Sequence, residues 1–314
     1  MSGLPTVDDV RAARERLAPY VRRTPTYAHD AIAFKLELLQ VTGSFKVRGA
    51  FNAVLQLPPE QHARGVVAVS AGNHGLAVAH VGKTLGIRAT VAMPESAPAR
   101  TVERMRADGA EVMLLPTVAE AFALAEERRA QGQTLIHPYD DPRVMAGQGT
   151  IGFELLEDVP DLETLVISVG GGGLIAGIAT VVKALRPRVR IYGVETAGAD
   201  TMRQALDAGE PVTLPAITSI ATTLGAPYVS PATFDAAQRL LEDVFVVSDA
   251  QAIEGMLAAQ EALSVLPEPA AACGYAAVLA GLVPRPHRGT LAILLCGGNV
   301  SIDDLVRWRS TLTV

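Results

Sequence analysis

One lysine in this sequence stands where its side chain can do carbonyl chemistry. Lys46 follows Phe45 in a run of small residues and precedes an apolar segment that continues as a helix to Leu57. Burial favours the neutral amine of a lysine, which is the form that attacks a carbonyl carbon. Most single lysines are solvated surface charges, so Lys46 indicates chemistry only in combination with other motifs.

A run of four glycines is the second motif, and its members are Gly170, Gly171, Gly172 and Gly173. They join an apolar strand to an apolar helix, where backbone N–H groups can converge on an anion. Tight packing alone is the weaker explanation, because four consecutive glycines cost much backbone entropy. An amine for an aldehyde and a cradle for a phosphate are together what pyridoxal phosphate requires.

The same glycine run also fits a dinucleotide-binding pattern. Gly171, Gly173 and Ala176 have its spacing, and Glu195 ends the next strand at about the distance of a ribose-binding carboxylate. An NAD-linked oxidoreductase therefore stays open as an alternative. No Gly-Lys-Ser or Gly-Lys-Thr follows the glycines, so the pattern does not indicate a nucleoside triphosphate site.

A second turn lies between a strand predicted at 65–69 and a helix predicted at 75–85. It consists of Ser70, Ala71, Gly72, Asn73 and His74. Its backbone N–H groups can receive a carboxylate, and Asn73 can hydrogen-bond a ring oxygen. His74 has the chemistry of a general base, although a histidine in a turn more often satisfies local backbone groups.

A cysteine closes an apolar strand near the end of the sequence. Cys296 precedes Gly297, Gly298 and Asn299. A buried structural thiol is the simplest interpretation. In a pyridoxal-phosphate enzyme the thiol would face the pyridine nitrogen as a neutral group and would not hold the ring protonated. Such a partner limits racemisation and transamination and suits prompt loss of a leaving group from the β-carbon.

Composition narrows the class of protein. The 314 residues suffice for two domains, and the net charge of −6 without a basic block makes nucleic acid a poor candidate partner. The longest apolar stretch, 270–283, is too short to span a bilayer, and the first residues lack a signal-peptide pattern. Two cysteines, Cys273 and Cys296, argue against a disulfide framework and for a reducing cytoplasm.

Short apolar strands alternate with amphipathic helices, which predicts an α/β fold with parallel sheets. Strands are predicted at 65–69, 88–93, 111–115, 164–169, 189–194, 244–247 and 290–296. Helices are predicted at 6–20, 75–85, 102–108, 118–130, 174–185, 250–263 and 271–282, with a last one after Asn299. No low-complexity linker interrupts this pattern, so the domains are expected to be interleaved.

Taken together, the motifs resemble the threonine/serine dehydratase family of pyridoxal-phosphate enzymes, of which serine racemase is a close relative. The resemblance runs from about Leu17 to Leu305. It implies the tryptophan-synthase-β type of fold (fold type II): α/β, with two open twisted, mostly parallel sheets flanked by helices. Residues 1–56 and 139–314 would form a large cofactor-binding domain and 57–138 a small mobile one. A cytoplasmic homodimer acting on a small amino acid is also implied.

The resemblance assigns roles position by position. Lys46 would be the Schiff-base lysine, and Phe45 would pack beside the cofactor ring. Asn73 would bond the phenolic oxygen, and Cys296 would face the pyridine nitrogen. The tetraglycine turn would bind the phosphate. The substrate carboxylate would be held by the turn of Ser70, Ala71, Gly72, Asn73 and His74.

Departures from the family pattern carry further expectations. Ala71 stands where serine racemases have a serine that acts as the second base, which weakens the racemase interpretation. In members that bind Mg²⁺ or Ca²⁺, Glu195 and the carbonyl of Ala199 would be ligands, but the third position is Thr201 rather than an acid. Thr222-Thr223 replaces an expected Asp-Gly near the substrate side chain. The segment between Pro25 and Lys35 is shorter than usual, and no regulatory domain is expected after the catalytic part.

The predicted reaction is therefore β-elimination from a β-hydroxy amino acid, L-threonine or L-serine first, to a 2-oxo acid and ammonia. A serine racemase and a 3-hydroxyaspartate dehydratase are alternatives within the same chemistry. An NAD-linked oxidoreductase and a non-catalytic amino-acid-binding protein are alternatives outside it.

Overall fold

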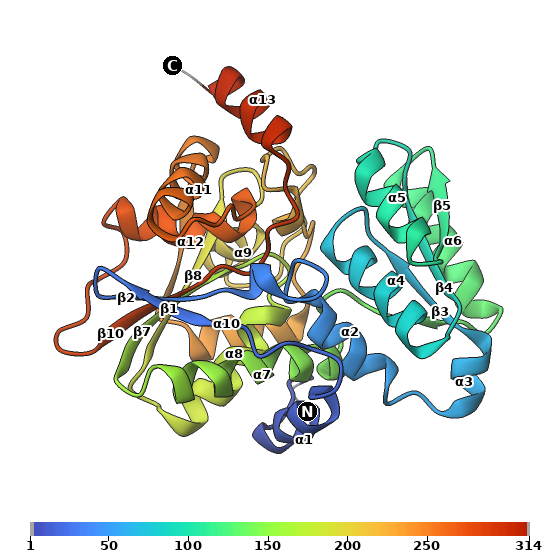
Figure 1. Cartoon of the computed structure of the whole chain (residues 1–314), viewed down its shortest axis with the longest axis horizontal. Helices are drawn as coiled ribbons and strands as arrows, with labels where there is room; N and C mark the ends of the chain where they lie inside the picture. The colour runs from blue at the N-terminus through green and yellow to red at the C-terminus, as the bar shows by residue number, and fades with distance from the viewer. Residues whose placement is uncertain (1–2, 313–314) are drawn as a thin grey trace.

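The computed structural model describes residues 3–312, and its elements form two sheets with helices on both faces (Figure 1). The larger sheet has six strands in the order β1-β2-β10-β7-β8-β9, and every pairing is parallel except that of β1 with β2. The strands are β1 (Thr26–His29), β2 (Ile32–Lys35), β10 (Thr290–Leu294), β7 (Leu162–Ser168), β8 (Arg190–Thr196) and β9 (Asp243–Val247).

The smaller sheet has four parallel strands in the order β5-β4-β3-β6. They are β5 (Glu111–Leu115), β4 (Ala89–Pro94), β3 (Val66–Val69) and β6 (Thr134–Leu135). All four come from one continuous stretch, while the strands of the larger sheet lie before and after it. The predicted fold class is confirmed. The division after residues 56 and 138, and the mobility of 57–138, stay predictions.

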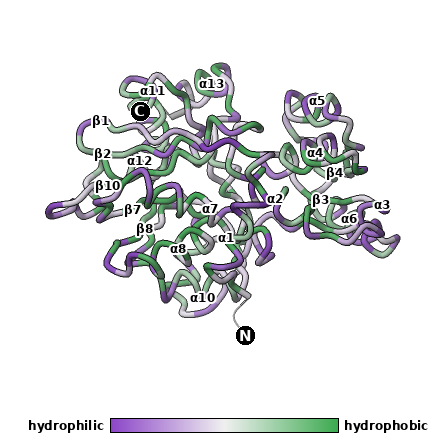
Figure 2. Tube along the Cα trace, turned by 60° about the horizontal axis from the view of Figure 1, so that its bottom comes forward, coloured by the Kyte–Doolittle hydropathy of each residue, from purple (hydrophilic) through white to green (hydrophobic). Residues whose placement is uncertain are grey.

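Helices cover both sheets because each has an apolar face to bury. Those of the larger sheet are α7 (Pro142–Asp158), α8 (Gly173–Leu185), α9 (Thr201–Ala208), α10 (Pro231–Leu240), α11 (Asp249–Leu263) and α12 (Pro269–Leu279). In addition, α1 (Val7–Leu17) packs on α7, α13 (Ile302–Leu312) packs on α11, and α2 (Lys46–Val54) packs on α7 and contributes to the hydrophobic core of the smaller sheet. Those of the smaller sheet are α3 (Pro59–Arg64), α4 (Asn73–Leu85), α5 (Ala99–Ala107) and α6 (Val118–Ala130). Hydrophobic residues run along α8 and most of β7 (Figure 2), the two elements that flank the tetraglycine turn. Within the described residues, no helix has the length and apolar character needed to cross a membrane.

Several elements differ from the prediction. The segment between Pro25 and Lys35 forms the β1–β2 hairpin, whose turn places Asp30 and Ala31 at positive φ. No Asn-Gly or Asp-Gly marks that turn, so this segment carries no hairpin signal. Helices α7, α9 and α10 were not predicted. Helix α7 contains three glycines, which argue against a helix in isolation, but Gly147 packs against the backbone of α2 and Gly149 against that of α8.

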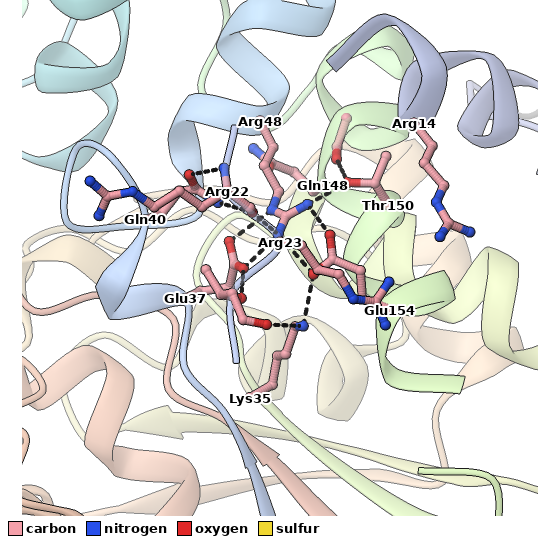
Figure 3. Close-up of polar contacts among 12 residues, drawn as sticks. Arg14, Arg22, Arg23, Lys35, Glu37, Gln40, Arg48, Gln148, Thr150 and Glu154 are labelled. Atoms are coloured by element: carbon pink, nitrogen blue, oxygen red, sulfur yellow. Dashed lines mark hydrogen bonds and ion pairs between the residues drawn. The ribbon is translucent and has the colours of Figure 1, made fainter. Parts of the chain in front are cut away.

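A buried cluster of charges fixes α2, the helix that begins at Lys46 (Figure 3). Arg48 donates from Nε and Nη2 to Glu37 at 2.8 and 2.7 Å, and from Nη1 to Glu154 at 2.7 Å. Lys35 lies 2.7 Å from the other oxygen of Glu154. Burial by itself would raise the pKa of Glu37, yet the charge and hydrogen bonds of Arg48 hold it below its usual value. The cluster joins α2 to β2, to α7 and to the 3-10 turn η1 (Glu37–Leu39).

Candidate active site

A cavity lies where the carboxyl ends of β7 and β10 meet the first turns of α2, α4 and α8. In open α/β sheets this edge is where ligands bind. The cavity holds about 460 Å³ of empty space, counted with its open mouth. Its walls include these predicted residues: Phe45, Lys46, Asn73, Gly170, Gly171, Gly172, Gly173 and Cys296. They also include residues that were not predicted as site residues, among them Tyr139, Ser168, Thr223 and Glu268.

Lys46 is the first residue of α2, and its amine faces this cavity. The Nζ atom donates to the carbonyl oxygen of Pro138 at 2.9 Å and lies 5.2 Å from the centre of the Phe45 ring. Burial lowers the pKa of Lys46 to about 8, although Cys296 and Glu268 nearby act in the opposite direction. A substantial fraction of this amine is therefore neutral and nucleophilic near physiological pH.

The tetraglycine turn ends at the amino terminus of α8, and Gly172 has a φ of +86°. No side chain caps this helix, and none of the hydrogen bonds recorded for the described residues uses the N–H groups of Gly170 to Gly173. These donors lie at the positive end of a 13-residue helix, the arrangement that binds phosphate. Packing also needs the glycines: a Cβ on Gly171 would overlap the Tyr139 ring, and one on Gly170 would lie 2.8 Å from the Leu224 carbonyl oxygen. Tight packing, the weaker explanation of the four glycines from sequence, therefore accounts for them together with anion binding by the free N–H groups.

Asn73 takes part in a chain of hydrogen bonds that connects the two sheets. Its Nδ2 donates to Glu268 Oε1 at 2.7 Å, and its Oδ1 accepts from Asn299 Nδ2 at 2.6 Å. Thr223 Oγ1 donates to the same Glu268 oxygen at 2.8 Å. Burial raises the pKa of Glu268 despite these donors. Because both ends of the Asn73 amide are occupied, its orientation in the cavity is fixed.

The turn before α4 presents small, half-buried residues to solvent: Ser70, Ala71 and Gly72. The N–H of Gly72 donates to Ser70 Oγ at 3.1 Å, and no side chain caps α4. His74 is buried and donates from Nε2 to the carbonyl oxygen of Ile136 at 2.7 Å. Burial lowers the pKa of His74 to about 3, so the ring is neutral. The geometry favours a structural part for His74 over a part as a general base.

Two thiols and a hydroxyl form a neutral polar group at the end of β7 and β10. Cys273 Sγ donates to Ser168 Oγ at 3.3 Å, and Ser168 also bonds the side chain of Cys296. Burial raises the pKa of Cys296 well above its ordinary value, and the nearby Glu268 raises it further. The thiol is therefore uncharged, as the proposed neighbour of a pyridine nitrogen must be.

The candidate metal ligands have other partners. Glu195 is buried and accepts from the N–H groups of Met202 at 3.0 Å and Arg203 at 2.7 Å, so it caps α9. Burial raises its pKa to about 8. Thr201 donates its hydroxyl to the carbonyl oxygen of Ala226, and Ala199 pairs with Thr196. Among the described residues no group of three or more His, Cys, Asp or Glu side chains is arranged to hold a metal ion. This donor set, with both oxygens of Glu195 and the hydroxyl of Thr201 already engaged, does not fit a cation.

The capping by Glu195 also bears on the NAD alternative. A ribose-binding carboxylate must reach the ligand, whereas both oxygens of Glu195 are hydrogen-bonded inside the protein. Glu195, the acid of the dinucleotide pattern, therefore caps α9 and is not available to a ribose hydroxyl.

Glu268 is the most important residue that the sequence analysis missed. It directly precedes Pro269, the first residue of α12, and its side chain does not cap that helix. A lone acid between apolar segments, just before a proline, is a weak sign of a buried carboxylate with a task. Tyr139 and Ser168 carried no comparable sign, since each is recognisable only from its place beside the tetraglycine turn.

Comparison with known proteins identifies the family to which this chain belongs. The model of the pyridoxal-phosphate dependent enzyme family matches residues 17–297. An L-threonine ammonia-lyase of Geobacter sulfurreducens is 39% identical over 94% of this chain and 76% of its own length. A phenylserine dehydratase of Ralstonia pickettii is 36% identical over 97% of this chain and 96% of its own length.

Solved structures agree with the sequence relatives. The structure of maize serine racemase superposes with a TM-score of 0.92 at 36% identity and covers 98% of this chain and 97% of its own. With the matching motifs and fold, this chain belongs to the pyridoxal-phosphate dependent enzymes of fold type II, in the group that contains threonine dehydratases and serine racemases.

Proposed function

We propose that this enzyme catalyses β-elimination from a β-hydroxy amino acid, L-threonine or L-serine first, to give a 2-oxo acid and ammonia. One observation carries the proposal: the Lys46 amine, with a pKa lowered to about 8, faces the same cavity as the free N–H groups of the tetraglycine turn. The threonine ammonia-lyase and phenylserine dehydratase relatives support this class of reaction.

The residues of the cavity fit pyridoxal phosphate. The tetraglycine N–H groups suit the phosphate, Asn73 suits the phenolic oxygen, and the neutral Cys296 suits the pyridine nitrogen. Lys46 supplies the amine for the aldehyde. When bound, the cofactor supplies an electrophilic aldehyde carbon and an electron sink for the charge left on the α-carbon.

Residues of the protein itself bind the substrate carboxylate, remove the α-proton and restrict water. The N–H groups of Asn73 and His74 lie in the uncapped first turn of α4 and bind the substrate carboxylate, whereas those of Ser70 and Gly72 already donate to the Ala92 carbonyl oxygen and to Ser70 Oγ. The Lys46 amine removes the α-proton, for which its lowered pKa suits it. The helices and strands around the cavity restrict water, so that the proton moves between Lys46 and substrate.

Ala71 favours elimination over racemisation. A racemase needs a second acid–base group on the opposite face of the substrate, and the methyl group of Ala71 cannot carry a proton. We expect Ala71→Ser to increase the rate at which L-serine is converted to D-serine, measured by chiral chromatography. An unchanged rate of D-serine formation would contradict this account of the turn.

The test of the function combines a substrate panel with one variant. Wild-type protein loaded with pyridoxal phosphate is assayed for 2-oxo acid and ammonia from L-serine, L-threonine and L-threo-3-hydroxyaspartate. We expect Lys46→Ala to abolish turnover, while its unfolding curve stays close to that of the wild type. Normal turnover by this variant without added amine would refute the role of Lys46, and no product from any substrate would refute the reaction.

We also propose a homodimer in a cytoplasmic setting, with 57–138 moving against the rest of the chain. These three proposals rest on the family resemblance and on the two unpaired cysteines. Light scattering of the loaded protein tests the dimer.

A further inference from the structure

Thr223 stands at the mouth of the cavity, in the 3-10 turn η2 (Thr222–Leu224). The backbone of this turn is held in place on both sides. The Cα atom of Leu224 lies only 3.1 Å from where a Cβ on Gly170 would stand, so the turn packs directly on the tetraglycine segment. On its other side, the N–H of Ile220 donates to Asp249 Oδ2 at 3.0 Å.

The side chain of Thr223 is fixed as well. Its hydroxyl donates to Glu268 Oε1 at 2.8 Å, and Glu268 is buried and held by Asn73. A β-branched side chain with its oxygen bound in this way has one rotamer left. That rotamer turns the methyl group toward Gly72, where Cγ2 lies 3.3 Å from the position a Cβ would take.

Two fixed points determine where a substrate side chain must go. The turn containing Gly72 binds the carboxylate in the proposed function, and Lys46 must reach the α-carbon. The tetraglycine turn and Tyr139 close the inner side of the cavity, since Tyr139 packs on Gly171 and Gly173. The β-substituent is left with the outer side, where the methyl group of Thr223 faces Gly72.

We propose that Thr223 limits the size of the β-substituent, so that this enzyme prefers L-serine and L-threonine to β-hydroxy amino acids with an aromatic or long β-group. This inference rests on the proposed β-elimination. A difference of one methyl-sized group in a close-fitting pocket changes relative kcat/KM by about 10- to 200-fold. Removal of the Thr223 methyl group should therefore relax the preference within this range.

The experiment compares two variants at one position. Thr223→Ser removes the methyl group and keeps the hydroxyl donor to Glu268, whereas Thr223→Val keeps the size and loses the donor. For each loaded enzyme, kcat/KM is measured for L-serine and for L-threo-3-phenylserine. We expect Thr223→Ser to raise the phenylserine-to-serine ratio at least about 10-fold, and Thr223→Val to leave the ratio close to that of the wild type. Thr222→Ser makes the same chemical change outside the cavity wall and serves as the matched control.

A binding measurement separates this inference from the proposed function. L-alanine and L-phenylalanine have no β-leaving group, and their dissociation constants can be obtained from the change in absorbance of the loaded enzyme. Thr223→Ser should tighten L-phenylalanine relative to L-alanine even if no substrate is turned over. If the wild type turns over L-serine while Thr223→Ser leaves both ratios unchanged, the inference is overturned. A Thr223→Val variant as relaxed as Thr223→Ser would also overturn it, because the hydroxyl would then be the cause.

Discussion

The amine of Lys46 should react with electrophiles at a lower pH than an ordinary solvent-exposed lysine does. Burial lowers its pKa from 10.5 to about 8. At pH 7 an amine with a pKa of 8 is about one-tenth neutral, whereas one with a pKa of 10.5 is only about 0.03% neutral. The neutral fraction therefore differs by about 300-fold at pH 7, and by about twofold or less once the pH exceeds 10.5. The reactivity of the Lys46 amine should therefore rise as the pH increases through about 8 and level off at higher pH.

Competitive labelling of cofactor-free protein measures this difference. The protein is treated briefly with a trace of acetic anhydride at pH values from 6 to 10.5, and each lysine-containing peptide is quantified by mass spectrometry. Lys83, whose side chain is 57% exposed, serves as the reference within the same molecule. Dividing the labelling of Lys46 by that of Lys83 removes the hydrolysis of the reagent from the result. Added pyridoxal phosphate should protect Lys46 and leave Lys83 labelled.

Two results would refute this reasoning. If the labelling of Lys46 still rises steeply between pH 9 and 10.5, its pKa is not lowered, and the cavity does not desolvate the amine. If pyridoxal phosphate protects Lys83 as well as Lys46, the protection does not come from the tetraglycine site. The first outcome would remove the lowered pKa of Lys46, and the second would remove the phosphate site; the proposed function depends on both.

Two further predictions concern the parts of the structure that hold the site together. Arg48→Met leaves the carboxylates of Glu37 and Glu154 without their main cation. We therefore expect the free energy of unfolding, measured in urea, to fall by about 3–5 kcal/mol. A loss no larger than that caused by Arg188→Met, at an exposed position, would contradict this prediction. Arg104 Nη1 donates to Asn299 Oδ1 at 2.7 Å and so ties α5 to the loop after β10. Arg104→Gln should therefore increase cleavage in limited proteolysis and lower kcat/KM, while the exposed Arg106→Gln should cleave like the wild type.

The elements beside the glycine turns could be predicted because their local pattern and their tertiary surroundings agree. Strand β7 and helix α8 are mostly apolar, and most of the residues of both are buried. The glycines between them mark the boundary unambiguously. The same holds for β3 and α4 around the turn of Gly72. In such places the residues that form the element are also those that the core requires.

Helix α7 shows what local pattern cannot supply. Its glycines oppose a helix by propensity, but Gly147 and Gly149 allow α2 and α8 to approach at backbone distance. The stabilisation comes from neighbours that are about 100 residues away in one case and about 30 in the other, so nothing in the window itself indicates it. Glu268 was missed for a related reason. Its partners Asn73 and Thr223 lie 195 and 45 residues away in the chain.

The position of Arg48 explains how a charged cluster can lie so close to a lysine whose pKa stays low. Residues two apart on a helix point about 200° from each other, so Lys46 faces the cavity while Arg48 faces the opposite side of α2. There Arg48 and Lys35 are matched by Glu37 and Glu154, which leaves this buried quartet with no net charge. The lowered pKa of Lys46 accordingly has burial as its largest cause, with opposing effects from Cys296 and Glu268 and none from the quartet. The cluster thus holds the first turn of α2 in place without repelling a proton from Lys46 or attracting one to it. An unbalanced cluster at the same place would change the pKa of the amine, and with it the pH at which the enzyme works.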